Sequence, residues 1–254
     1  MKIKFICLNL WFGGKLFEPI IEFLQREKPD ILAVQEVYDS KDKKIEDRFR
    51  SVEEIKKRLG FKYDFFSPAC VAVFPDKKIP AGNAIFSHFP ISKSNTIFIH
   101  SSFGEVENYE APIAIDFSFT PRNMQHAEIK INNNKLNVFN TQGVWGKDSA
   151  DNEDRLKMSE AIVQNIKDKE NVILCGDFNI TPETQTIGNI EKYLKNIFKG
   201  EIKTSFNVKQ KTNPIFSSLV VDMIFASHNL KIVNYYCPKV DVSDHLPLAA
   251  IFEA

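Results

Sequence analysis

The sequence lacks an excess of charge of either sign. Its 254 residues include 33 Lys and Arg residues and 33 Asp and Glu residues, so the formal net charge is zero. Such a balance argues against a protein that holds nucleic acid mainly through a strongly positive surface. It does not exclude a nuclease, because a bound metal ion supplies positive charge locally.

Long apolar runs are also missing, and cysteine is scarce. No stretch approaches the roughly 20 apolar residues that a membrane-spanning helix requires. The first segment, MKIKFICLNLWFGG, has two lysines before an apolar run, but Asn9 interrupts that run and no small-residue cleavage site follows. The four cysteines form no C-x-x-C pair, which favours buried thiols over disulfides or a zinc site. These absences predict a cytoplasmic protein.

Two well-known catalytic motifs are absent as well. The sequence contains neither a G-x-x-x-x-G-K-[ST] loop nor a G-x-S-x-G turn. The NTPase and serine-hydrolase classes therefore lack their main support. There is no linker, low-complexity tract or internal repeat, and a chain of this length forms one domain or two.

Short apolar segments dominate the sequence and predict many strands. Ile3, Phe5 and Cys7 lie two residues apart, which is the spacing of a strand that ends near Asn9. Residues 30–35 form a continuous apolar run, as in a buried strand. Further strands are expected at residues 69–74, 84–87, 96–99, 113–119, 126–131, 136–140, 172–175, 220–226, 232–236 and 248–252. Three asparagines at 132–134 predict a hairpin turn, because Asn tolerates positive φ.

Helical periodicity interrupts the strands at four places. Apolar residues spaced by three and four predict helices at residues 16–25, 42–59, 154–167 and about 187–197. Thr181 and Pro182 are expected to cap and open the last of these helices. Because the helices are interspersed among strands without regular alternation, the pattern indicates an α+β fold, with packed sheets and helices outside them.

Polar residues stand at the edges of several apolar runs. Each alone is also typical of a turn or a helix cap. The segments are Asn9, Gln35–Glu36, Asn140–Gln142, Asp177 with Asn179, and Ser243–His245.

Asp222 differs from these residues because it lies inside the apolar segment LVVDMIFA. A carboxylate in such a strand requires a partner to offset its desolvation. His245 is the candidate partner, although an isolated His near a strand is more often structural. A contact between the two would fix the imidazole tautomer and raise the pKa of His245.

Together these residue types suit hydrolysis of a phosphoester. Glu36, Asp244 and the amide oxygen of Asn9 are hard oxygen ligands of the kind that Mg²⁺ prefers. Asp177 can accept a proton from the attacking water, and Asn179 can hold the water or the phosphate in line. A protonated His245 can stabilise charge on phosphoryl oxygens.

Seven short motifs follow one another along the chain. They are LNLW (8–11), QEV (35–37), GNAIFS (82–87), FNTQ (139–142), GDFN (176–179), VDMIFAS (221–227) and SDHLP (243–247). Read in this order, the motifs resemble the endonuclease/exonuclease/phosphatase superfamily, which includes pancreatic-type DNases, abasic-site endonucleases, inositol-polyphosphate 5-phosphatases, neutral sphingomyelinases and CCR4-type deadenylases. Since they extend from residue 8 to residue 247, the resemblance implies one domain over residues 1–254.

The resemblance implies the DNase I-like fold, a four-layered α/β/β/α sandwich of two mixed sheets flanked by helices, with the site at one rim. It makes Glu36 the principal ligand of Mg²⁺, for which Mn²⁺ is a possible substitute, with Asn9 and Asp244 in support. Asp177 and Asn179 would orient the nucleophile and the phosphate. The resemblance also implies that His245 would contact the phosphate and that Asp222 would orient His245. Asn83 would have a weak substrate-facing role.

Gln142 departs from the family pattern, in which many members have His after Asn-Thr. A Gln can donate a hydrogen bond to a phosphoryl oxygen, but it cannot become cationic or transfer a proton. We assign Gln142 to the catalytic site and expect Gln142→Ala to lower the rate.

The expected reaction is hydrolysis of a phosphodiester, with nucleic acid as the favoured substrate and a monomer as the active form. Trp11 and Trp145 flank two site motifs and could stack on bases, although packing explains them equally well. The alternatives are a phosphomonoesterase, a phosphodiesterase for lipid headgroups or small molecules, and a catalytically inactive binding relative. Against a lipid substrate, the sequence shows no basic amphipathic helix or lipidation signal.

Overall fold

Two mixed β-sheets packed face to face form the centre of the protein. The computed structural model describes residues 1–107, 109–110 and 117–253. In spatial order, the first sheet contains β12 (Lys231–Tyr236), β13 (Leu248–Glu253), β1 (Lys2–Asn9), β2 (Ile31–Tyr38), β4 (Lys78–Ser87), β3 (Tyr63–Val73) and β6 (Gly104–Glu107). The second contains β10 (Lys195–Asn196), β11 (Asp222–Ala226), β9 (Val172–Asp177), β8 (Asn134–Gln142), β7 (Arg122–Ile131) and β5 (Ile91–His100).

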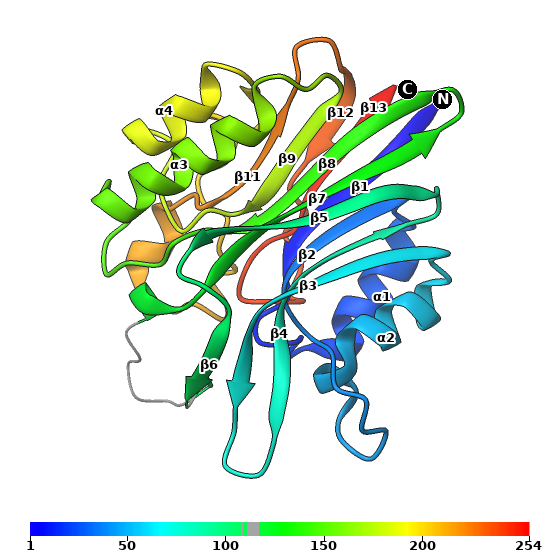
Figure 1. Ribbon diagram of the computed structural model, residues 1–254, viewed down its shortest axis with the longest axis vertical. Helices are drawn as coiled ribbons and strands as arrows, with labels where there is room; N and C mark the ends of the chain where they lie inside the picture. Colours follow the sequence, from blue (N-terminus) through cyan, green and yellow to red (C-terminus); the bar gives the residue numbers. More distant parts are fainter. Residues whose placement is uncertain (108, 111–116, 254) are drawn as a thin grey trace.

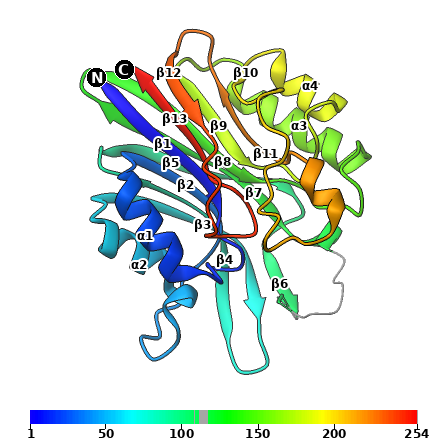
Figure 2. The same cartoon turned by 180° about the vertical axis from the view of Figure 1, so that it is seen from behind.

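Helices cover the outer face of each sheet, so the fold has four layers (Figure 1, Figure 2). The first sheet is covered by α1 (Phe17–Glu27) and α2 (Ser51–Leu59), and the second by α3 (Glu153–Ile166) and α4 (Gln185–Glu191). The strand β1 shows how the layers arise. Ile3, Phe5 and Cys7 belong to the core between the sheets, whereas Ile6 and Leu8 pack under the helices. A strand covered on both faces is apolar throughout, because neighbouring side chains point to opposite faces.

A polar layer lies within the apolar core between the sheets. The amide of Asn140 on β8 donates to the carbonyl oxygens of Val34 and Ala84 at 2.9 and 3.1 Å and to Gln125 Oε1 at 2.9 Å. Its Oδ1 accepts from Gln35 Nε2 at 2.5 Å. The bonds with Val34, Ala84 and Gln35 cross from one sheet to the other, and all of these bonds satisfy amides that would otherwise be buried without partners.

Most predicted elements are present, including the hairpin between β7 and β8, where Asn132 has a φ of 53°. The predicted helix at 42–59 was wrong in its first half. The α-helix starts at Ser51 and is preceded by a 3₁₀ turn, Asp47–Arg50. Upstream, Asp42 accepts a hydrogen bond from the Lys44 backbone, and such a local bond competes with helix formation.

The predicted start of the fourth helix was also wrong. Thr184, not Thr181, caps it, and its Oγ1 accepts from the backbone N–H of Ile187. The helix ends at Glu191, so Leu194 and Ile197 are buried beyond it. In the predicted strand at 113–119, residues 113–116 lie outside the described part, and Phe117–Phe119 is a 3₁₀ turn. The pattern missed β6, which pairs in parallel with β3.

All four cysteines are free thiols, as predicted, and three of them are buried. Among the described residues, no helix is both long and apolar enough to cross a membrane.

Candidate active site

The ends of β1, β8 and β9 lie at one rim of the sandwich, opposite the chain termini (Figure 1), and they carry several of the predicted site residues. The parallel pair β1 and β2 ends there with Asn9 opposite Gln35, and the parallel pair β8 and β9 ends with Gln142 opposite Asp177. The antiparallel strand β11 begins at the same rim, which places Asp222 opposite Asp177. The sheet topology therefore gathers side chains that are far apart in the sequence.

A cavity of about 180 Å³ opens at this rim. It is lined by the predicted Glu36, Gln142, Asp177, Asn179, Asp244 and His245, together with Trp11, Phe12, Tyr109, Phe117, Arg122, Trp145, Phe206, Lys211 and Phe216. Polar and charged groups thus share the cavity with a set of aromatic rings, two of which are the tryptophans singled out from the sequence.

Glu36 is held in place by its backbone and by three hydrogen bonds. Its φ is 58°, at a register shift between Val34 and Val37, where the pairing of β2 with β4 is irregular. Residues other than Gly and Asn rarely adopt this backbone conformation, and those that do are concentrated at functional sites. The carboxylate accepts from Phe12 N at 2.8 Å, from Asn9 Nδ2 at 3.0 Å and from Gln142 Nε2 at 2.7 Å.

Asn9 links two of the acids. Its Nδ2 donates to Glu36 Oε1 and to Asp177 Oδ2, both at 3.0 Å, and its Oδ1 accepts from Trp11 N at 2.9 Å. The amide is fully buried. As a metal ligand Asn9 would offer the Oδ1 that here accepts from Trp11.

Asp177 and Asn179 are fixed by the tight turn after β9. Asn179 has a φ of 55°, and its backbone N–H donates to Asp177 Oδ1 at 3.0 Å. Its side chain donates to the carbonyl oxygen of Gly143 at 3.2 Å. A Cβ on Gly143 would lie 2.2 Å from the Phe178 carbonyl oxygen, so only Gly allows this close approach. Burial raises the pKa of the Asp177 carboxyl.

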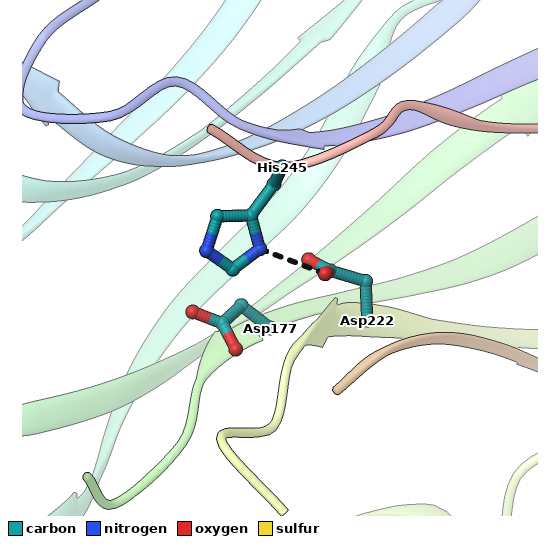
Figure 3. A group of neighbouring side chains, drawn as sticks. All are labelled: Asp177, Asp222 and His245. Atoms are coloured by element: carbon teal, nitrogen blue, oxygen red, sulfur yellow. Dashed lines mark hydrogen bonds and ion pairs between the residues drawn. The ribbon is translucent and has the colours of Figure 1, made fainter. Parts of the chain in front are cut away.

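His245 and Asp222 form the predicted pair, with His245 Nδ1 2.8 Å from Asp222 Oδ2 (Figure 3). Both side chains are almost completely buried, and Asp177 lies beside the same ring. Burial alone lowers the pKa of His245, but the neighbouring carboxylates, Asp222 foremost, outweigh it and raise that pKa to about 10. The Asp222 carboxylate therefore favours the protonated form of the His245 ring at neutral pH.

The donor atoms of the rim fit a hard divalent cation. Glu36, Asp177 and Asp244 present carboxylate oxygens to the cavity, which is the ligand type of Mg²⁺. Among the described residues, the acidic and His side chains whose ligand atoms lie within 4.8 Å of one another are Asp177, Asp222 and His245, and Glu36 and Asp244 lie outside this group. In that group His245 Nδ1 already faces Asp222 at 2.8 Å, and the carboxylates are the hard oxygen donors at the rim.

Asn83 lies apart from the cavity. It is buried on β4, and its amide donates to Asn123 Oδ1 at 3.0 Å and to the Asn123 carbonyl oxygen at 3.2 Å. These hydrogen bonds join the two sheets. They give no support to a substrate-facing role for Asn83.

The sequence patterns missed three cations at or near the site. Arg122 is buried on β7 and donates from Nη1 to Gln142 Oε1 at 2.5 Å, which connects it through Gln142 to Glu36. Lys211 forms an ion pair with Asp244 at 2.9 Å. Burial lowers its pKa, but Asp244, Glu36 and Asp177 more than compensate and raise it. Nothing in the sequence around Arg122 or Lys211 indicates a place at the site, because an isolated basic residue near a strand or in a loop is usually exposed on the surface.

Arg155 is the third, and it is fully buried in the first turn of α3. Its guanidinium donates to the carbonyl oxygen of Asn179 at 2.8 Å and to that of Val144 at 3.1 Å. It therefore ties the loop after β8 to the turn that carries Asn179. The helical spacing predicted apolar residues on this face and gave no sign of a buried Arg.

Residues 6–245 match the Endonuclease/Exonuclease/phosphatase family, and the chain belongs to this family. Its members are hydrolases that act on phosphoesters. A comparison with curated proteins gave no match.

Solved structures share the fold at low sequence identity. An endonuclease/exonuclease/phosphatase from Bacteroides vulgatus has a TM-score of 0.74 at 16% identity, over 100% of this chain and 99% of that one. TDP2 from D. rerio, complexed with a single strand DNA product, has a TM-score of 0.72 at 18% identity, over 100% and 99%. A mannosyl-6-phosphatase from Bacteroides thetaiotaomicron has a TM-score of 0.70 at 17% identity, over 99% and 100%. These likenesses confirm the predicted DNase I-like α+β fold.

Proposed function

We propose that this protein is a Mg²⁺-dependent phosphodiesterase that cleaves nucleic acid. The observation that carries the proposal is a small cavity lined by three carboxylates, a set of aromatic rings and His245, whose ring is paired with the buried Asp222. Its volume suits one phosphoryl group with part of what is attached to it. The carboxylates provide metal ligands, and the paired His provides a cation for the phosphate.

Each predicted residue has a defined task in this proposal. Glu36 and Asp244, supported by Asn9, would hold Mg²⁺, which polarises a phosphoryl oxygen when bound. Asp177 accepts the proton of the attacking water, and its raised pKa makes it a better acceptor. Asn179 orients that water or the phosphate.

His245 donates a hydrogen bond to a phosphoryl oxygen through the ring nitrogen that does not face Asp222, and thereby stabilises the charge that develops there. Asp222 keeps the ring protonated and oriented. Gln142 cannot supply the charge of the His that many family members carry at this position. Arg122, whose guanidinium donates to Gln142 Oε1, brings positive charge to that side of the cavity.

The aromatic rings favour nucleic acid over other phosphodiesters. Trp11 and Trp145 line the cavity and are only half-buried, so each presents part of an indole at the opening. Stacking of a base on such a ring contributes about 1–3 kcal/mol for any base. The similar fold of TDP2, solved with a single strand DNA product, is consistent with this substrate class.

A phosphomonoester is the second candidate, and the mannosyl-6-phosphatase with the same fold is the observation that favours it. The cavity accommodates a terminal phosphate as well as a bridging one. We further propose that residues 1–254 form a single domain, since the site is assembled from strand ends of both sheets, and that this domain acts as a monomer. The free thiols fit the reducing cytoplasm, which we propose as its compartment.

The first experiment measures nicking of supercoiled plasmid and cleavage of single-stranded oligonucleotides, each with Mg²⁺ and with EDTA. The variants are His245→Ala and His228→Ala, a matched control because His228 is exposed. We expect Mg²⁺-dependent cleavage that His245→Ala loses and His228→Ala retains. Cleavage of p-nitrophenyl phosphate without cleavage of either nucleic acid would favour the phosphomonoesterase. No turnover of any phosphoester would indicate a binding protein.

A further inference from the structure

Lys211 occupies an unusual place at the rim of the site. Its Nζ lies 2.9 Å from Oδ2 of Asp244, whose side chain is only 5% exposed. It also shares the cavity with Glu36 and Asp177. The ammonium group thus lies among the carboxylates to which the proposed function assigns the metal and the attacking water.

The loop that carries Lys211 is fixed to the segment that carries Asp244. The backbone N–H of Asn207 donates to the Asp244 carbonyl oxygen at 2.8 Å, and its side chain donates to the Ser243 carbonyl oxygen at 2.8 Å. The Lys211 backbone N–H in turn donates to the Asn207 carbonyl oxygen at 2.9 Å. The backbone therefore holds the two residues next to each other, which favours the ion pair more than two long side chains on an open surface would.

An alternative partner for the Lys211 ammonium lies close to Asp244. Its Nζ lies 5.6 Å from the centre of the Phe216 ring, which also lines the cavity. The side chain is one third exposed, so the ammonium can leave Asp244 and keep both water and the aromatic face as partners. The flexible stem of Lys makes this movement possible without moving the loop.

We propose that Lys211 is an internal counterion of the metal site, which a divalent cation displaces from Asp244, so that the lysine sets how tightly the site binds metal. Two cations cannot share the same carboxylate oxygens without repulsion, so binding of one must weaken the other. Removal of the lysine charge therefore strengthens metal binding. This inference rests on the metal site of the proposed function.

Metal binding is measured directly, by calorimetric titration with Mn²⁺ and Mg²⁺ and by thermal unfolding in EDTA and in excess Mn²⁺. The variants are Lys211→Met, Lys211→Gln and Lys211→Arg. Lys209→Met is the matched control, because Lys209 lies two residues away, is 73% exposed and is 4.0 Å from Asp241.

We expect Lys211→Met and Lys211→Gln to bind Mn²⁺ about tenfold more tightly than the wild type, whereas Lys211→Arg and Lys209→Met stay within about twofold. In EDTA the two neutral variants should melt below the wild type, because Asp244 loses its partner, and Mn²⁺ should remove that difference. Unchanged or weaker Mn²⁺ affinity in both neutral variants would overturn the inference while leaving the proposed function intact. Absence of Mn²⁺ binding in every protein, the wild type included, would overturn both.

Discussion

Replacement of Arg155 by Met should destabilise the protein and disable the site at once. The Arg155 side chain is fully buried, and it donates to several backbone carbonyl oxygens. The acceptors are the carbonyl oxygens of Val144, Asp148, Ala150 and Asn179, together with Asp148 Oδ1. Met fills a similar volume but donates nothing.

The size of the effect follows from the exposure of the acceptors. A hydrogen bond from a charged donor contributes roughly 1.5–3 kcal/mol. Asp148 and Ala150 are exposed and Asn179 is half-buried, so these carbonyls regain water after the substitution, whereas Val144 is buried and does not. We therefore expect a loss of about 3–5 kcal/mol in the free energy of unfolding. For a chain of this size that corresponds to a fall in the melting temperature of about 6–20 °C.

The assay is urea denaturation combined with steady-state kinetics below the melting temperature. Arg155→Lys should lose less stability, because an ammonium replaces part of the donor set, and Arg26→Met at an exposed position should change it by less than about 1 kcal/mol. Because Arg155 holds the Asn179 carbonyl, the folded Arg155→Met protein should also show a lower kcat. Stability within about 1 kcal/mol of the wild type would refute the assignment of Arg155 as the anchor of these loops.

Three further predictions concern single side chains. Gln142→Ala removes the link between Arg122 and Glu36. It should lower kcat about tenfold, in line with the loss of one neutral hydrogen bond at the site. Unchanged kinetics would show that Gln142 is not part of the site. Asp222→Asn keeps the shape but removes the charge that holds His245 protonated, so kcat should fall roughly 10²–10³-fold, and a fall of less than fivefold would contradict the pairing. Asn140→Ala breaks the bonds between the two sheets and should cost about 2–4 kcal/mol in urea denaturation; a loss below about 0.5 kcal/mol would show that the polar layer contributes little.

Much of the fold was predictable because strand signals are local. The apolar run that ends at Asn9 predicts a buried strand and its last residue. The run that ends at Gln35 predicts the buried strand β2, which continues to Tyr38. The same strand ends carry the candidate site, so Glu36, Asp177 and His245 could be proposed from their positions beside apolar runs. Asp222 was found by a different argument, the cost of burying a charge in an apolar strand.

The remaining features depend on contacts between distant segments. Ile45 and Phe49 have helical spacing, yet both pack in a cluster with Tyr38 and precede the α-helix. Lys211 and Arg122 have roles that are set by what lies across the cavity, and nothing in the neighbouring sequence indicates it. The spacing of apolar residues indicates which face of a helix or strand is buried, but it does not indicate which segments pack against that face.

The most direct test of the central claim is cleavage of a single-stranded oligonucleotide as a function of Mg²⁺ concentration in Glu36→Gln and Glu22→Gln. Glu36 is the proposed main metal ligand, whereas Glu22 is exposed on α1 and serves as the control. We predict that EDTA abolishes cleavage by the wild type, that added Mg²⁺ restores it, and that Glu36→Gln lowers the rate at least about 100-fold while Glu22→Gln leaves it unchanged. Cleavage that persists in EDTA, or a Glu36→Gln protein that is as active as the wild type, would contradict a metal-dependent phosphodiesterase at this site.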